Sequence, residues 1–186
     1  MASAPKIHEE LIHGVTSTTL TSHGDRRGSL TEFFRTNWEN RYYPVQWNMT
    51  TSSPLVLRGV HVHLTHWDYL VLAHGRMQLG LCDLRRNSPT FMKSCIAELD
   101  AGNKVGWSIP PGVAHGFYFP IDTILIYGVS AYWSVKDEFG CRWDDPDLGL
   151  GWDVSDPILS PHDAAAPSLS ILMQTVDAFD FPLERG

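Results

Sequence analysis

The stretch RGVHVHLTHWDYLVLAHG, residues 58–75, gathers much of the chemistry of this chain in one short segment. Four of the nine histidines lie in it: His61, His63, His66 and His74. His61 and His63 are two residues apart, so on a β-strand both side chains point to the same face. A segment that brings two imidazoles to one face is a candidate for a site that moves protons or holds a metal ion.

A second histidine segment follows later in the chain. Residues 109–116 read IPPGVAHG and place His115 just after a Pro-Gly turn. If this segment and residues 58–63 are both strands of one barrel, each brings imidazole inward. The sequence therefore predicts a single site to which two strands contribute histidine.

Short segments rich in β-forming residues cover most of the chain. The predicted strands are residues 29–35, 45–51, 55–63, 69–73, 77–84, 94–99, 104–109, 115–119 and 123–132. Glycine, proline, asparagine and aspartate separate them, as expected for tight turns. Helix is predicted only at residues 38–42 and 168–175. This pattern predicts an all-β protein, an antiparallel sandwich or barrel of which the double-stranded jelly roll is one form.

Length and composition set limits on the function. The 186 residues, 43% of them hydrophobic, predict a single domain over residues 1–186 with a sizeable core, and a proline-rich tail from about residue 157 that wraps the barrel. The net charge of -7 argues against a nucleic-acid partner, which needs a basic face. We find no signal peptide and no apolar run long enough to span a bilayer, so no membrane association is expected. Three cysteines without paired spacing fit a cytoplasmic protein.

Several motifs occur together and in a fixed order. They are Asp25-Arg-Arg-Gly28 with Glu32-Phe-Phe34, Gln46-Trp-Asn48, Leu57-Arg-Gly-Val-His61, Asp83-Leu-Arg85 with Ser88-Pro-Thr-Phe91, residues 109–117, Tyr127, Asp145-Pro-Asp-Leu148 with Gly151-Trp152, and Leu159-Ser-Pro-His-Asp163 with Ala166-Pro167. In this order the chain resembles the dTDP-4-dehydrorhamnose 3,5-epimerases and related nucleotide-sugar epimerases, over roughly residues 24–169. The resemblance implies a cupin-type jelly roll, a homodimer and an enzyme of deoxysugar biosynthesis.

The resemblance also implies an activity. Such enzymes act on a nucleotide-linked 4-keto-6-deoxyhexose, whose C3 and C5 hydrogens are acidic because both carbons flank the C4 ketone. The resemblance makes His61 the base, Asp163 the carboxylate that orients it, and Tyr127 the acid on the opposite face. No cofactor is expected for this chemistry.

The resemblance assigns seven further positions to the substrate site, with Arg58 and His115 near the developing enolate oxygen and Trp133 in place of a family tyrosine. They are Arg27, Glu32, Gln46, Asn48, Arg58, His115 and Trp133. Arg27 suits a diphosphate because a guanidinium can donate two parallel hydrogen bonds.

Taken singly, these residues also fit structural roles. His61 fits a core histidine, Tyr127 a core aromatic residue and Asp163 a turn or helix cap. The presence of all three together favours catalysis over a non-catalytic sugar-nucleotide binder.

Two positions depart from the family pattern. Asp68 stands where the family usually has a lysine near the substrate oxygen, once a gap of about three residues is placed in the preceding loop. A carboxylate there would repel an enolate that an ammonium would stabilise. Trp133 stands where the family has a tyrosine, and the neighbouring Tyr132 would point to the other face of a regular strand.

The same segment also supports an alternative, a metal-dependent cupin enzyme such as an isomerase, lyase or oxygenase. Metal cupins carry His-x-His, then an acid, then glycine, and a further histidine after a turn. That pattern selects His61, His63, Asp68 and His115 as ligands of one divalent ion. In this interpretation the ion would replace the missing lysine charge. His66 and His74 are predicted to be loop and surface residues.

Overall fold

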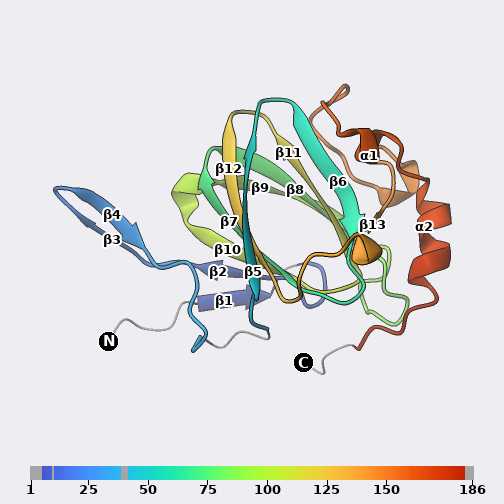
Figure 1. Ribbon diagram of the computed structural model, residues 1–186, viewed down its shortest axis with the longest axis horizontal. Helices are drawn as coiled ribbons and strands as arrows, with labels where there is room; N and C mark the ends of the chain where they lie inside the picture. Colours follow the sequence, from blue (N-terminus) through green and yellow to red (C-terminus); the bar gives the residue numbers. More distant parts are fainter. Residues whose placement is uncertain (1–5, 10, 39–41, 183–186) are drawn as a thin grey trace.

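A computed structural model describes residues 6–9, 11–38 and 42–182, and nearly all of its regular structure is β (Figure 1). Two antiparallel sheets form the body, and the main core lies between them. Among the described residues, no helix is both long enough and apolar enough to cross a membrane.

The larger sheet has six strands in the order β1-β2-β10-β7-β12-β5. Their bounds are β1 Lys6–Glu9, β2 Thr16–Thr19, β10 Val105–Ile109, β7 Asp68–His74, β12 Thr123–Val129 and β5 Gln46–Ser52. The smaller sheet has five strands in the order β13-β6-β11-β8-β9. Their bounds are β13 Phe139–Gly140, β6 Val56–Val62, β11 Val113–Phe119, β8 Arg76–Asp83 and β9 Ser94–Asp100.

A separate two-stranded hairpin projects from the body (Figure 1). It is formed by β3, Ser22–Asp25, and β4, Gly28–Thr31. All of its strand residues except Thr31 are exposed, and Leu30 has 66% of its surface accessible to solvent. Such hairpins are marginal on their own in water, so this one is suited to contact a further surface.

The helices lie in the last quarter of the chain. The four-residue helix α1, Pro161–Ala164, begins after Ser160, whose hydroxyl accepts a hydrogen bond from the amide of Asp163. The longer α2, Leu169–Val176, packs on the smaller sheet through Leu169, Leu172 and Val176. These residues join Val60 and Val62 of β6 in a second apolar cluster.

The sequence predicted most of these elements. The predicted strands from residue 45 to residue 119 are confirmed, with ends shifted by two residues or fewer, and so is the helix at 168–175. Strand 29–35 ends at Thr31, and strand 123–132 ends at Val129. Strands β1, β2, β3 and β13 were not predicted. The helix predicted at 38–42 falls largely on residues 39–41, which lie outside the described residues.

A buried ion pair fixes the end of β8. Asp83 is fully buried, and its carboxylate accepts hydrogen bonds from Arg85 Nε and Nη2, each at 2.8 Å. The hydroxyls of Ser88 and Thr90 donate to Oδ2 at 2.5 and 2.6 Å. Burial alone would raise the pKa of Asp83, but the hydrogen bonds from these four donors outweigh burial, so the net effect is a lowered pKa. Arg85 in turn donates to the carbonyl of His13.

We expect Asp83→Ala to lower the free energy of unfolding by about 3–5 kcal/mol, because it leaves the Arg85 guanidinium buried without its partner. Urea denaturation followed by circular dichroism measures the change. A matched control exists in Arg142 and Asp144, which form the same two-residue pairing on the surface. Asp144→Ala should change the stability little. Equal losses in both variants would contradict this account.

Candidate active site

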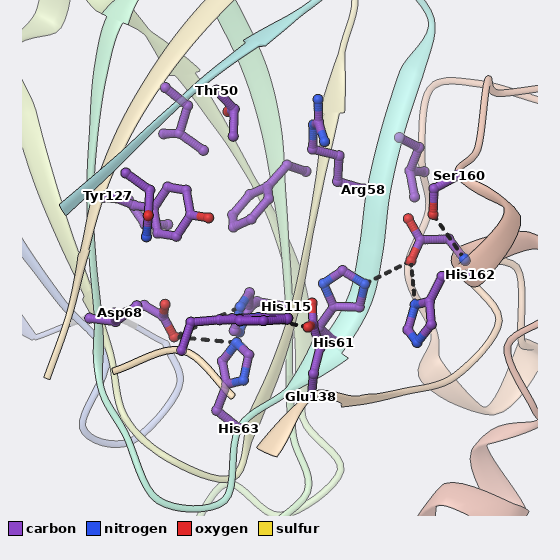
Figure 2. A pocket seen from close by; sticks show the side chains of 18 of the residues that line it. Thr50, Arg58, His61, His63, Asp68, His115, Tyr127, Glu138, Ser160 and His162 are labelled. Atoms are coloured by element: carbon purple, nitrogen blue, oxygen red, sulfur yellow. Dashed lines mark hydrogen bonds and ion pairs between the residues drawn. The ribbon is translucent and has the colours of Figure 1, made fainter. Parts of the chain in front are cut away.

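A cavity of about 630 Å³ opens between the two sheets and is lined by side chains from both. Its apolar wall includes Leu70, Leu125, Phe117 and Val129. Its polar lining consists of Asn48, Thr50, Arg58, His61, His63, His66, Asp68, His115, Tyr127, Trp133, Glu138, Ser160, His162 and Asp163. Figure 2 shows how several of them, among them His61, Asp68 and Tyr127, lie around the cavity. The mixture of apolar walls and a few polar groups is typical of a small-molecule site.

His61 and Asp163 form the closest ion pair in this cavity. His61 lies on β6, and its Nε2 is 2.7 Å from Asp163 Oδ1 on α1, across 102 residues of sequence (Figure 2). A carboxylate only accepts hydrogen bonds, so Nε2 carries the proton. This tautomer leaves Nδ1 of a neutral ring with a free lone pair. The pair therefore has the arrangement of an oriented base.

The surroundings keep Asp163 ionised. Its side chain is 6% exposed, and its other oxygen lies 3.4 Å from the amide of Gly59. Burial alone would raise the pKa of Asp163, but the hydrogen bond and positive charge of His61 outweigh it, with smaller help from Ser160 and His162. The net result is a pKa of about 2. An ionised carboxylate stabilises an imidazolium on His61.

Gly59 allows β6 to lie this close to its neighbour. It has φ +116°, and a side-chain carbon there would lie 2.9 Å from both the Cα of Gly116 and the carbonyl of His115 on β11. A larger residue would therefore push apart the strands that carry His61 and His115.

Tyr127 faces the same cavity from the other sheet. It lies on β12, so the two sheets place it and His61 on opposite walls (Figure 2). Burial raises the pKa of its phenol most, and the carboxyl groups of Asp68 and Glu138 raise it further. The positive charge of Arg58 lowers the pKa by a smaller amount. Tyr127 therefore stays protonated at neutral pH and can donate a proton.

A second polar group lies deeper in the cavity. His63 Nε2 and His115 Nε2 lie 3.8 and 3.9 Å from Asp68 Oδ2. The rings of His63 and His66 stack with their centroids 4.0 Å apart. His66, Asp68 and His115 are each at most 4% exposed. His66 lies in the loop between β6 and β7, as predicted, but its side chain is buried rather than at the surface, whereas His74 is exposed at the end of β7.

Backbone and side-chain acceptors fix the ring orientation of these histidines. His63 Nδ1 donates to the carbonyl of Asp137 at 2.9 Å, and His66 Nδ1 donates to its carboxylate at 2.9 Å. His115 Nδ1 donates to the carbonyl of Val113 at 3.2 Å. In its neutral form each of these three rings thus holds its proton on Nδ1 and has a free lone pair on Nε2.

Burial is the largest influence on the pKa values of Asp68, His66 and His115. It raises the pKa of Asp68, more than His63 and His66 lower it. It lowers the pKa of His115 well below its ordinary value, with a further decrease from His63, and it also lowers the pKa of His66. His66 and His115 are therefore neutral at pH 7.

The structure divides the predicted residues into two sets. Asn48, Arg58, His115 and Trp133 line the cavity, together with the three predicted catalytic residues. Gln46 lies next to them, because its amide donates to Asn48 and accepts from the Trp133 amide. Arg27 and Glu32 are not among the cavity-lining residues: Arg27 is on the projecting hairpin and pairs with Asp25, and Glu32 pairs with Arg35.

The four-ligand metal set predicted from the sequence does not form. His61 turns its Nε2 to Asp163, and the described residues instead form two potential ligand groups, His61 with His162 and Asp163, and His63 with His66 and Asp68. Sequence reasoning did not assign four residues of the cavity region to the site: His66, Asp137, Thr50 and Glu138. Of these, His66 carried a signal, because it belongs to the histidine-rich segment. The other three stand outside the motifs.

Known proteins with similar sequences and structures point to one family. The sequence profile described as dTDP-4-dehydrorhamnose 3,5-epimerase matches residues 9–170. A dTDP-4-dehydrorhamnose 3,5-epimerase of Sinorhizobium fredii (strain NBRC 101917 / NGR234) is 34% identical over 156 residues, covering 78% of this chain and 80% of that protein.

Two crystal structures are similar over almost their whole length. The dTDP-6-deoxy-D-glucose-3,5-epimerase of Legionella pneumophila Philadelphia 1, in complex with dTDP-4-keto-L-rhamnose, has a TM-score of 0.86 and 28% identity, covering 98% of this chain and 100% of that one. A 3'-monoepimerase of Streptomyces bikiniensis, in complex with dTDP-quinovose, has a TM-score of 0.83 and 28% identity, covering 93% and 92%.

The low pKa of Asp163 predicts an effect of pH on stability. Its folded pKa of about 2 lies below the ordinary 3.8, so its contribution is complete above pH 3.8 and is lost as the pH falls toward 2. The shift corresponds to about 2 kcal/mol. We expect the stability difference between the wild type and Asp163→Asn to shrink by about that much between about pH 6 and about pH 2, measured by urea denaturation. A difference independent of pH would contradict the assignment.

Proposed function

The chain belongs to the dTDP-4-dehydrorhamnose 3,5-epimerase family, and we propose that its His61, oriented by Asp163, is the base that epimerises a dTDP-linked 4-keto-6-deoxyhexose. The chain is thus an epimerase with the two-sheet jelly roll of its relatives. Relatives include both 3,5-epimerases and 3-epimerases, so inversion takes place at C3 and C5 or at C3 alone. The 2.7 Å bond between His61 and Asp163 is the observation that carries the proposal.

The first step removes a proton next to the ketone. His61 Nδ1, the nitrogen not bonded to Asp163, takes the hydrogen from C3 or C5, and the electron pair moves to the C4 oxygen as an enolate. The ionised carboxylate of Asp163 stabilises the imidazolium that forms. Arg58, which also lines the cavity, supplies positive charge that favours the enolate.

The second step returns a proton from the other side. Tyr127 faces His61 across the cavity, from β12 of the opposite sheet (Figure 2). Its phenol is protonated at neutral pH and donates to the carbon face that His61 does not reach. Removal on one face and return on the other inverts the centre.

Two further polar groups are placed to hold the sugar. Thr50 Oγ1 lines the cavity, is buried, and has no hydrogen-bond partner among the described residues. A buried hydroxyl without a partner is costly, and a substrate hydroxyl would satisfy it. The amide of Asn48 is oriented by Gln46 Nε2 at 2.9 Å and points its remaining groups to the same space.

We expect the two catalytic side chains to have separable effects in heavy water with dTDP-4-keto-6-deoxyglucose. His61→Asn should lower both deuterium incorporation and inversion by about a hundredfold or more. Tyr127→Phe should lower inversion more than incorporation, because His61 can still remove a proton and return deuterium to the same face. Proton NMR of C3 and C5 measures the incorporation, and product analysis measures the inversion.

His74→Asn is the matched control, because His74 is an exposed histidine of β7 that does not line the cavity. It should exchange at the wild-type rate. Wild-type protein that incorporates no deuterium at either carbon would exclude this substrate, and unchanged exchange in His61→Asn would exclude His61 as the base.

We further propose that the enzyme is a homodimer in which the β3–β4 hairpin completes the partner's cavity. In its own chain the hairpin projects from the body (Figure 1). Among the described residues, Arg27 at its turn pairs with the neighbouring Asp25, and its side chain is 84% exposed. A second copy would cover the exposed Leu30 and give Arg27 a diphosphate to bind.

Arg27→Ala should raise KM for the dTDP-sugar about tenfold or more and change kcat little, since the residue would contribute binding alone. Light scattering should give twice the 20.9 kDa mass of one chain. Arg142→Ala is the control, because Arg142 forms a similar exposed pair with Asp144 but lies outside the cavity. A monomer whose KM is insensitive to Arg27 would contradict this proposal.

A further inference from the structure

A second group of side chains in the cavity takes no part in the proposed proton transfer. One ring nitrogen each of His63 and His66 and one carboxylate oxygen of Asp68 lie within 4.8 Å of one another. His63 follows β6 and Asp68 begins β7, so the tight connection between two strands brings the three together. We propose that these three side chains bind one first-row divalent transition-metal ion, of the class of Zn²⁺, Fe²⁺ and Co²⁺, with its remaining coordination positions open to the cavity.

Asp68 is the first reason for the proposal. It is 4% exposed, and its carboxylate accepts no hydrogen bond from any residue that the structure describes. Its ion-pair neighbours, Nε2 of His63 and Nε2 of His115, lie 3.8 and 3.9 Å away, which is too long for a charge-assisted hydrogen bond. Two ligands of a tetrahedral ion with bonds of 2.0–2.1 Å lie about 3.3 Å apart, so the ligand atoms would have to draw together from within 4.8 Å, and the stacked rings of His63 and His66 would have to turn toward the ion.

Asp137 provides the second reason. Its carbonyl accepts from His63 Nδ1 and its carboxylate accepts from His66 Nδ1, so one residue fixes both rings. The carboxylate is itself held by the Leu64 amide and the Thr65 hydroxyl. Metal-binding histidines are commonly oriented in this way, with the proton on one nitrogen bonded to a carbonyl or carboxylate and the lone pair of the other on the metal.

The donor set selects the class of ion. Two imidazoles and one carboxylate suit transition metals, and the same set with open positions is the facial triad of iron(II) sites. Mg²⁺ and Ca²⁺ prefer oxygen ligands and fit two imidazoles poorly. His115 Nε2 lies beside the set, 3.9 Å from the same oxygen of Asp68.

A rival group in the same cavity is less suited to a metal. His61, His162 and Asp163 are also within 4.8 Å of one another. However, His61 and Asp163 are joined directly at 2.7 Å, which leaves no room for an ion between them. The His162 side chain is 64% exposed. We therefore assign the metal to His63, His66 and Asp68.

An ion at this position would act on the ketone. Asp68 offers no positive charge to an enolate that forms in this cavity, and Arg58 is the one lysine or arginine among its described lining residues. A bound divalent cation would supply positive charge there and polarise a substrate carbonyl oxygen. This role rests on the proposed function, whereas the binding of the ion does not.

The test measures metal binding directly. The full-length protein is stripped with a chelator, dialysed, and titrated with Co²⁺ alone, followed by visible absorption, and with Zn²⁺ alone, followed by calorimetry. We expect one ion per chain, with Co²⁺ bands more intense than those of the hydrated ion. His66→Ala and Asp68→Asn should each weaken Zn²⁺ binding by about tenfold or more.

Asp137 gives a graded check on the same site. Asp137→Ala removes the carboxylate that orients His66 and should weaken Zn²⁺ binding about 10–100-fold, whereas Asp137→Asn keeps an acceptor oxygen and should retain most of the affinity. His162→Asn, in the rival group, should leave the affinity unchanged. Thermal unfolding of each variant identifies any that fail to fold.

Absence of saturable Co²⁺ and Zn²⁺ binding to the wild type would overturn the proposal whatever the variants do. Binding that survives His66→Ala and Asp68→Asn but is lost in His162→Asn would also overturn it and move the ion to the rival group. Deuterium exchange into dTDP-4-keto-6-deoxyglucose is measured on the same samples. Metal binding without exchange would leave this site standing and reject the proposed substrate.

Discussion

The hydrogen bond between His61 Nε2 and Asp163 Oδ1 is the contact on which the active site depends. It joins β6 to α1 across 102 residues, so the pair depends on the packing of the C-terminal segment on the smaller sheet. Because the carboxylate is ionised and largely shielded from water, it fixes the tautomer of His61 and stabilises its protonated form. The rest of the site is arranged around a base that is already oriented.

This one bond also divides the histidines of the cavity. His61 is committed to a carboxylate, whereas His63 and His66 are held by Asp137 with their Nε2 lone pairs free. The cavity thus holds two carboxyl groups with different roles. Asp163 stabilises the base, and the buried Asp68 is the proposed ligand of a cation. The two groups are compatible because they share no ligand atom.

The sequence was sufficient for the central strands and for residues that the structure brings together in one cavity. Alternating apolar residues and turn residues locate the central strands, and the order of motifs carries His61, Tyr127 and Asp163. Strand β2, Thr16–Thr19, was missed because it is polar and depends on pairing with β10. The spacing of the histidine segment placed His61 in the metal set, since spacing does not show that His61 turns its Nε2 to Asp163 on α1. The role of Asp137 depends on a 3₁₀ turn, Val135–Asp137, that was not predicted from the sequence.

Nitrogen-15 NMR of the histidine rings, recorded before and after addition of Zn²⁺, tests this division of roles most directly. The account predicts that His61 carries its proton on Nε2 in both spectra and that its resonances move little. The Nε2 resonances of His63 and His66 should shift on metal binding while their Nδ1 atoms stay protonated. A His61 ring that is protonated on Nδ1, or whose Nε2 resonance shifts to that of a metal ligand, would contradict the account, because the base would then be part of the metal site.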